Sequence, residues 1–352
     1  MTTQEVIMRH ITRPVARELT GLALALTLAP TASAALAAPA YAGTGEHAAH
    51  MGAHHMIRYV SVKGCADKSY GQVPCGHWRL DLIDGTHVSL DDALVHSRDA
   101  KGRTEAGATA PVTVSGDGES VAYFRRKDGR VVVREFHGPV HVMPADALPK
   151  GVAIDRAALQ LSLDGGRLAV MYSDKKGGEH ARVFAVSDPG NPATISGYEQ
   201  FEGFSGDGSA VLVRDRTDDN TDELVAYDAS GRELGRVVPP QVVSNNSPRA
   251  LSADGRTVAV VTGSAGKPVL KLYDMVADRV VGSVPYTGRG GSLPDMADWT
   301  GDHQVTVHVN GEGASGARVT ILEIDTRTGA TRVRDSYKVR SDAYVYASCG
   351  GG

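Results

Sequence analysis

The sequence is poor in aromatic residues and in cysteine, and neither sign of charge dominates it. Its 352 residues include five Phe, two Trp and three Cys, and 37 Lys and Arg stand against 41 Asp and Glu. The formal net charge of −4 argues against a nucleic-acid-binding surface, which carries a basic excess. After residue 42, no apolar run approaches the roughly 20 residues that span a bilayer. We therefore expect no nucleic-acid partner, no membrane span in the mature chain, and a monomer.

Sustained helical periodicity is also missing beyond the N-terminal segment, and a repeated turn takes its place. An apolar residue, Ser or Thr, any residue, Asp and usually Gly recur five times, each time followed by a short apolar run. The aspartates of this unit are Asp117, Asp164, Asp207, Asp254 and Asp302. Asp-Gly between apolar runs is a strong hairpin signal, because Gly adopts a positive φ without steric penalty. A spacing of 43 to 48 residues indicates a repeat architecture.

Each repeat offers four short strands, one before the turn, one after it, and a closing pair. In the first repeat we expect strands at 57–62, 78–83 and 87–90. Four strands in roughly 45 residues are typical of the blade of a β-propeller. The sequence thus predicts an all-β fold, a single β-propeller of six blades with four antiparallel strands each; five or seven blades are the alternatives. Segments 92–110 and 145–157 are expected to be connections.

The C-terminal segment is expected to close the propeller. The first repeat lacks an inner strand before Ile57, and residues 344–351 imitate the approach to a repeated turn, with Gly350 standing where the aspartate would be. Pairing the last strand with the first repeat would protect an edge that is otherwise open. The propeller domain is expected to span residues 57–350.

The repeated unit resembles the WD40-like (PD40-type) repeat of exported bacterial TolB-like propellers, in which Ser-Pro-Asp-Gly is usual. The matching turns begin at Ser115, Ser162, Ser205, Ser252 and, in degenerate form, Thr300. Proline is absent from all five, and His303 replaces the last glycine. The resemblance implies blades and not an activity, since relatives include both periplasmic interaction proteins and the lids of serine peptidases. No Gly-x-Ser-x-Gly nucleophile elbow follows here.

Residues 1–42 have the pattern of a secretory signal peptide. Arg9, Arg13 and Arg17 precede an apolar core at 22–28, and small-x-small cleavage sites end at Ala34 or Ala42. An N-terminal membrane anchor is the alternative, but the apolar core is short for one. No Cys follows the core and no Arg-Arg pair precedes it, so we expect general export and a secreted, extracellular protein. Residues 43–56 are expected to be a flexible His-rich spacer.

The three cysteines fall into a pair and a remainder. Cys65 and Cys75 flank one hairpin loop of the first repeat, and export favours a disulfide between them. Cys349 would lie at the opposite end of the strand that leads into this loop, too far from Cys65 and Cys75 for a disulfide. It is therefore expected either to stay free or to pair outside the domain.

Two groups of side chains are candidate metal ligands. In the acidic hairpin, Asp215, Asp219 and Glu223, helped by Thr217, would approximate a calcium loop; the alternative is a solvated turn, with Asn220 where glycine is preferred. In the spacer, the imidazoles of His47, His50, His54 and His55 suit Cu, Ni or Zn, although nothing holds them in place. We expect no bound metal and no cofactor.

Catalytic residues are not identifiable from the pattern. The Ser and Asp of the repeated turns recur in every blade, which favours a structural role. The remaining histidines (His77, His87, His96, His137, His141, His180, His303 and His308) are scattered, and a Ser-His-Asp triad is recognised by geometry, so the sequence neither supports nor excludes one.

The function predicted from the sequence is that of an exported binding or protein-interaction module. Its ligand, an unknown protein, glycan or small molecule, would lie at one mouth of the central channel, where the loops converge. The alternative is an enzyme of lactonase, lyase or hydrolase type with its site at the same mouth. A structural protein of the cell envelope is a third possibility. The sequence favours the non-enzymatic function.

Overall fold

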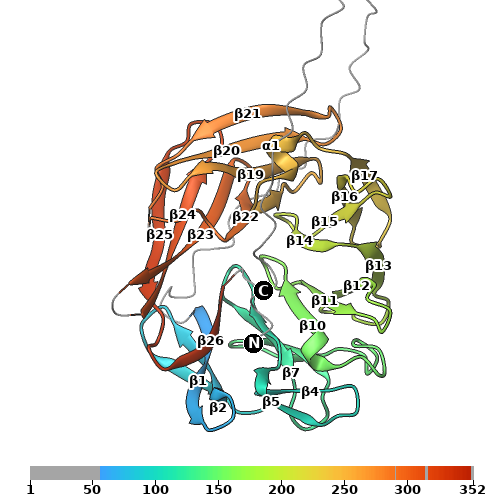
Figure 1. Ribbon diagram of the computed structural model, residues 1–352, viewed down its shortest axis with the longest axis vertical. Coiled ribbons are helices and arrows are strands. Elements are labelled where there is room, and N and C mark those ends of the chain that lie inside the picture. The colour runs from blue at the N-terminus through green and yellow to red at the C-terminus, as the bar shows by residue number, and fades with distance from the viewer. Residues whose placement is uncertain (1–55, 290, 314–315, 350–352) are drawn as a thin grey trace, which may run out of the picture. The chain divides into compact units, whose positions relative to one another are not determined.

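The computed structural model describes residues 56–289, 291–313 and 316–349. The chain divides into two compact units, Met1–Met51 and Gly52–Gly352, and the described residues belong to the second. They are almost entirely β-structure (Figure 1). In this part of the chain, helix is confined to α1 (Gln241–Ser244) and to the 3-10 turn η2 (Ile154–Arg156). Neither is long enough to cross a membrane.

Six four-stranded antiparallel sheets make up most of this unit. Sheet 1 contains, in spatial order, β26 (Ala343–Ser348), β1 (Ile57–Asp67), β2 (Gly71–Leu82) and β3 (His87–Leu90). Sheet 2 contains β6 (Val112–Val114), β7 (Ser120–Phe124), β8 (Val131–Glu135) and β9 (Val140–Val142). Sheet 3 contains β10 (Ala157–Leu161), β11 (Arg167–Ser173), β12 (Glu179–Ala185) and β13 (Ala193–Tyr198).

The other three sheets follow the same plan. Sheet 4 contains β14 (Gln200–Phe204), β15 (Ala210–Arg216), β16 (Asp222–Asp228) and β17 (Glu233–Val237). Sheet 5 contains β18 (Arg249–Leu251), β19 (Thr257–Ser264), β20 (Lys267–Asp274) and β21 (Arg279–Pro285). Sheet 6 contains β22 (Met296–Gly301), β23 (Gln304–Gly313), β24 (Gly316–Asp325) and β25 (Thr331–Lys338). Successive four-stranded antiparallel sheets are the architecture of β-propeller blades.

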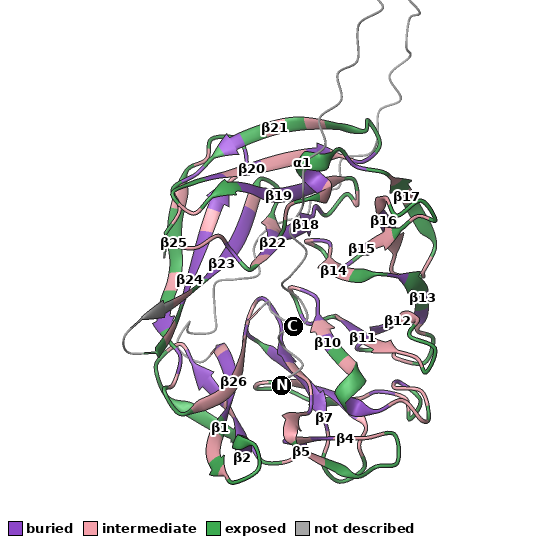
Figure 2. Ribbon diagram, viewed as in Figure 1, coloured by how far each residue is buried: buried purple, intermediate pink, exposed green. Residues whose placement is uncertain are grey.

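Apolar side chains pack between each sheet and the next. Examples are Phe124 with Leu168 between sheets 2 and 3, and Leu212 with Tyr273 between sheets 4 and 5. A further cluster joins sheet 6 to sheet 1, where the rings of Tyr59 and Tyr337 stack with centroids 5.2 Å apart. Figure 2 shows that burial is concentrated on the inner strands, while β17, β21 and β25 are largely exposed.

The C-terminal strand pairs with the first strand of the described chain. In the register of β26 with β1, Tyr59 lies opposite Ser348 and Val62 lies opposite Val345. Sheet 1 therefore combines the two ends of this unit of the chain (Figure 1). Gly350, expected at the aspartate position of a sixth turn, lies outside the described residues.

One expected connection is wrong. Segment 92–110 was predicted to be irregular, yet β4 (His96–Arg98) and β5 (Thr104–Thr109) form a two-stranded antiparallel sheet within it. The turn between them is held by Asp99, whose carboxylate accepts hydrogen bonds from the backbone N–H groups of Lys101 and Arg103, while Gly102 adopts φ +79°. The polar residues of this hairpin hid its strands, because only one face of it is covered.

Candidate functional site

Four of the five repeated aspartates have the same local geometry. In the second sheet, the Ser115 hydroxyl donates a hydrogen bond to Asp117 over 2.5 Å and accepts one from the backbone N–H of Ser120. The same Ser–Asp bond recurs in the following turns, at Asp164, Asp207 and Asp254. Each carboxylate also accepts the backbone N–H two residues on. These side chains are consumed by the turn itself, which is a structural use.

Asp302 differs from the other four. The preceding hydroxyl, that of Thr300, pairs with Thr306 instead, over 2.9 Å. Asp302 and His303 line an open groove of about 450 Å³ at the end of sheet 6. Arg332 and Glu323, which also line this groove, are direct neighbours on β25 and β24 and pair through two hydrogen bonds. The groove therefore already contains its own ion pair.

The disulfide between Cys65 and Cys75 is present, with Cα atoms 5.9 Å apart. The Cys349 thiol is unpaired. Burial raises the pKa of Cys349 to about 11. A neutral, buried thiol is a poor nucleophile.

The histidines of the spacer, His47, His50, His54 and His55, and the signal segment 1–42 lie outside the described residues.

The acidic hairpin 215–223 joins β15 to β16, and its carboxylates face different partners. Asp215 and Glu223 lie directly opposite each other in the strand register, and Arg236 donates hydrogen bonds to both, over 3.3 and 2.6 Å. The pKa of the Arg236 guanidinium is raised mainly by its hydrogen bond to Glu233, over 3.0 Å, and further by those to Glu223 and Asp215. Asp219, at the tip, accepts a hydrogen bond from the Thr217 hydroxyl, which lowers the pKa of that carboxyl.

A metal site is not visible in the part of the chain that the structure describes. No group of three or more His, Cys, Asp or Glu side chains there is placed to hold a metal ion. Arg236 supplies the positive charge between Asp215 and Glu223 that calcium would have supplied. The calcium hypothesis stays a prediction.

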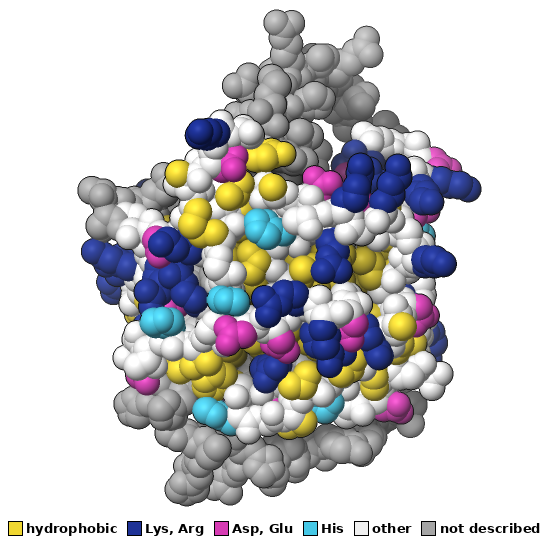
Figure 3. All heavy atoms as spheres, turned by 90° about the horizontal axis from the view of Figure 1, so that it is seen from below, with side chains coloured by type: hydrophobic (Ala, Val, Ile, Leu, Met, Phe, Trp, Pro, Cys, Tyr) yellow, Lys and Arg dark blue, Asp and Glu magenta, His cyan; other side chains and the backbone are white. Residues whose placement is uncertain are grey.

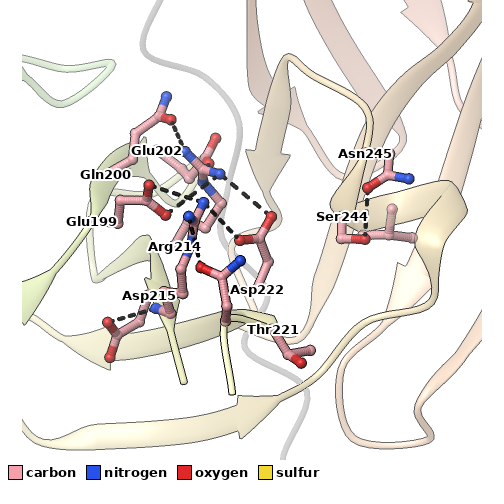
Figure 4. Close-up of polar contacts among 12 residues, drawn as sticks. Glu199, Gln200, Glu202, Arg214, Asp215, Thr221, Asp222, Ser244 and Asn245 are labelled. Atoms are coloured by element: carbon pink, nitrogen blue, oxygen red, sulfur yellow. Dashed lines mark hydrogen bonds and ion pairs between the residues drawn. The ribbon is translucent and has the colours of Figure 1, made fainter. Parts of the chain in front are cut away.

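The opposite face of the same hairpin carries a larger network, centred on Arg214 (Figure 4). The Arg214 guanidinium donates to the Gln200 side chain over 2.8 Å and lies 3.4 Å from Asp222 and 3.7 Å from Glu199. Arg216 contributes a second cation, 3.0 Å from Glu199. These residues come from the start of sheet 4 and from the two strands that border the hairpin, so the network ties the connection at 199–200 to the hairpin.

A buried ion pair extends the network into sheet 5. Glu202 and Arg249 lie 2.7 Å apart, and each side chain is only 4% exposed. Burial raises the pKa of Glu202, and the guanidinium groups of Arg249 and Arg214 oppose that rise. The contact at 2.7 Å is a charge-assisted hydrogen bond, which is the form that stabilises a buried carboxylate.

Arg249 also fixes the loop that precedes it. Its guanidinium donates to the backbone carbonyl groups of Val243 (3.0 Å) and Ser244 (2.7 Å), at the C-terminus of α1. A cation at this end of a helix satisfies carbonyl groups that have no partner within the helix. The residue therefore connects three things: α1, sheet 4 through Glu202, and the start of β18.

Sequence reasoning found one edge of this site and missed the rest. It singled out hairpin 215–223 for its acidic residues, whereas the structure pairs them with arginines from other strands. Glu202 and Arg249 are 47 residues apart, about one repeat. A charged residue just inside an apolar strand at the same point of two successive repeats was the available signal.

Comparisons with known proteins found similar solved structures but no family. No protein family and no curated protein matches the sequence. Among similar solved structures, TolB from Acinetobacter baumannii is 17% identical, with a TM-score of 0.44 over 83% of this chain and 66% of that chain. The structure from Agrobacterium tumefaciens that carries the TolB name is 13% identical, with a TM-score of 0.41 over 70% of this chain and 90% of that one.

A third similar structure is the β-propeller domain of Cps50 (Swd1) from Myceliophteria thermophila, 12% identical, with a TM-score of 0.40 over 70% of this chain and 73% of that one. This chain spans just under two thirds of the length of the Acinetobacter TolB. Two of these three structures carry the TolB name, and the third is a β-propeller domain.

Proposed function

We propose that the chain is an exported binding or protein-interaction module, built on a six-bladed TolB-like propeller at 57–350 that β26 closes. Six four-stranded sheets support the blade count. The pairing of β26 with β1 and the apolar cluster between sheets 6 and 1 support the closure. The disulfide between Cys65 and Cys75 supports export, because such bonds persist in oxidising compartments.

The proposed binding surface is the edge where the connections of sheets 4 and 5 meet, here called the braced edge: residues 199–200, 215–223 and 238–248. β15 ends and β16 begins at the hairpin, while β14 and β18 begin after the two connections. Antiparallel pairing puts these strand ends on one side of the sheets. The observation that carries the proposal is the buried Arg249, which fixes α1 to Glu202. A loop held in one conformation loses little entropy when a partner binds it.

A protein partner fits this surface best. The braced edge exposes two valines, Val238 (47%) and Val242 (38%), beside a network in which acidic and basic residues balance. Apolar centres with polar surroundings are typical of protein interfaces. A small molecule would need an enclosed pocket. The groove at Asp302 and His303 is open and belongs to sheet 6, which carries no part of the braced edge. Figure 3, seen from below the view of Figure 1, shows Lys and Arg side chains interspersed with acidic, His and hydrophobic ones on that side of the molecule.

The test is site-specific photocrosslinking in the culture that secretes the protein. A photoreactive amino acid replaces Val242 on the braced edge or, as the matched control, Val333 on the exposed strand β25, where the native valine is 44% exposed. We expect one discrete crosslinked species from position 242 and none from position 333. The species should disappear when Asn246 beside it is changed to Arg.

Equal crosslinking from both positions, or none from position 242, would contradict the proposal. A crosslink confined to position 333 would move the interface to the outer strands. In every case the two labelled proteins must unfold at the same temperature as the native chain.

A further inference from the structure

A second polar constellation lies on sheet 3, away from the braced edge. The Ser196 hydroxyl on β13 lies 2.8 Å from Nδ1 of His180 on β12. The other ring nitrogen of His180, Nε2, lies 3.4 Å from a carboxylate oxygen of Asp174. Serine, imidazole and carboxylate therefore form one continuous chain of polar contacts. This is the order in which a nucleophile, a general base and an orienting group are arranged in hydrolases.

A β-bulge places the serine. In the pairing of β12 with β13, Glu179 lies opposite Tyr198, but His180 lies opposite Ser196. The extra residue is Gly197, which adopts φ +77°. Bulges at sheet edges redirect a neighbouring side chain. Without the bulge, Ser196 would have a different partner across the strands.

The imidazole is held on both sides. The ring of Tyr172 stacks on that of His180, with centroids 5.3 Å apart. Asp174 accepts hydrogen bonds from the backbone N–H groups of Lys176 and Gly178, and these lower the pKa of its carboxyl, so it is ionised. An ionised Asp174 favours the tautomer with a proton on Nε2. Nδ1 is then left as an acceptor, free to take the Ser196 proton.

We propose that Ser196 is a nucleophile, activated by His180 and Asp174, that hydrolyses small carboxylic esters. The Ser196 oxygen attacks the ester carbonyl carbon while its proton passes to Nδ1 of His180. The C–O bond to the alcohol breaks, and the alcohol leaves with that proton. Water then attacks the acyl carbon and gives a proton to His180. The bond between that carbon and the Ser196 oxygen breaks, His180 returns the proton to this oxygen, and the carboxylic acid is released. No oxidant, metal or other co-reactant is needed.

The substrate class follows from the position of the serine. Ser196 is exposed on the outermost strand of its sheet. Small or activated esters can reach it directly from solvent. The Tyr172 ring beside His180 gives one apolar wall. This activity is independent of the braced edge and goes beyond the proposed binding function.

The first experiment uses a fluorophosphonate probe on the purified full chain, followed by peptide mapping. We expect a single adduct, on Ser196. The matched control serine is Ser283, which also lies exposed on an outer strand but pairs with Lys271 instead of a histidine. Ser196→Ala should abolish labelling, and Ser283→Ala should leave it unchanged. No adduct in the native chain, or an adduct that persists in Ser196→Ala, overturns the proposal.

The second experiment measures hydrolysis of p-nitrophenyl acetate. His180→Gln should lower the rate by about 10²- to 10⁴-fold, the usual contribution of general base catalysis. Ser196→Ala should fall to the same low rate as His180→Gln, because the two residues act as one unit. Asp174 is a positioning residue, so Asp174→Asn should lower kcat and leave KM unchanged, and Asp174→Glu should restore kcat. Variants that change the melting temperature but not the rate would show a merely structural pair and refute the assignment.

Discussion

At the scale of single residues, Asp298 and His308 have strongly perturbed pKa values. They lie on β22 and β23, on the side of sheet 6 opposite to Trp299 and Val307, which pack against sheet 5. Burial raises the pKa of Asp298 to about 7, against the opposing charge of Arg334. Burial lowers the pKa of His308 to about 3, and its buried Nδ1 has no hydrogen-bond partner in the described chain.

The two shifts have opposite effects on stability. Between about pH 4 and pH 7 the folded state keeps a proton on Asp298 that the unfolded state has lost, so this group destabilises the fold as pH rises. Between about pH 6.5 and pH 3 the unfolded state binds a proton on His308 that the folded state refuses, so this group destabilises the fold as pH falls. From about pH 4 to pH 6.5 the two effects offset each other.

Removing either titrating group should therefore reveal the effect of the other on the pH dependence of stability. In Asp298→Asn only His308 titrates, and the free energy of unfolding should fall as pH is lowered from about 6.5 toward 4. In His308→Gln only Asp298 titrates, and the same quantity should rise as pH is lowered from about 7 toward 4. Each change is bounded by about 4 kcal/mol. Urea unfolding across this range checks both, and two variants with parallel profiles would contradict the argument.

At the scale of elements, the brace between sheets 4 and 5 depends on a buried charge pair. Removing one member of such a pair leaves an uncompensated charge in a poorly solvated place, which is far costlier than losing an exposed pair. Glu202→Gln should lower the free energy of unfolding by about 3 kcal/mol. Arg249→Met should cost more, because the carbonyl groups of Val243 and Ser244 also lose their donor.

The control for this prediction is Arg216→Met, which removes a cation that is 42% exposed and should cost less than about 1 kcal/mol. The measurement is urea unfolding, with hydrogen exchange of residues 238–248 as a local readout. If Glu202→Gln behaves like Arg216→Met, the pair does not brace the loop.

The sequence predicted elements whose signal is local and missed contacts that cross between strands. The Ser-x-Asp-Gly turns are closed by bonds within six residues, so the period of their aspartates located five of the sheets. The absence of proline also has a local reason at Gly206, where a Cβ would lie 2.4 Å from the carbonyl oxygen of Trp299. By contrast, Ser196 meets His180 only through a one-residue bulge, and Arg249 meets Glu202 across two sheets. Neither contact can be predicted from the spacing of these residues in the sequence.

At the scale of the whole unit, the strand β26 belongs to the sheet formed by the first strands. Its loss would expose the edge of β1 and part of the apolar cluster that includes Tyr59 and Tyr337. Deleting 341–352 should therefore give insoluble protein or an unfolding transition that is no longer cooperative. Deleting only 350–352, which follow β26, is the control. Calorimetry that finds the native melting temperature in the longer truncation would contradict the closure.

The pairing of β26 with β1 has a consequence for the order in which the chain is made. A ribosome releases β1, β2 and β3 first and β26 last, with every other sheet in between. The inner edge of sheet 1 therefore stays unpaired until β26 has been synthesised. An unpaired edge favours pairing with a wrong strand or with a second chain. Protection of sheet 1 from aggregation therefore depends on a strand that is synthesised after all the other sheets.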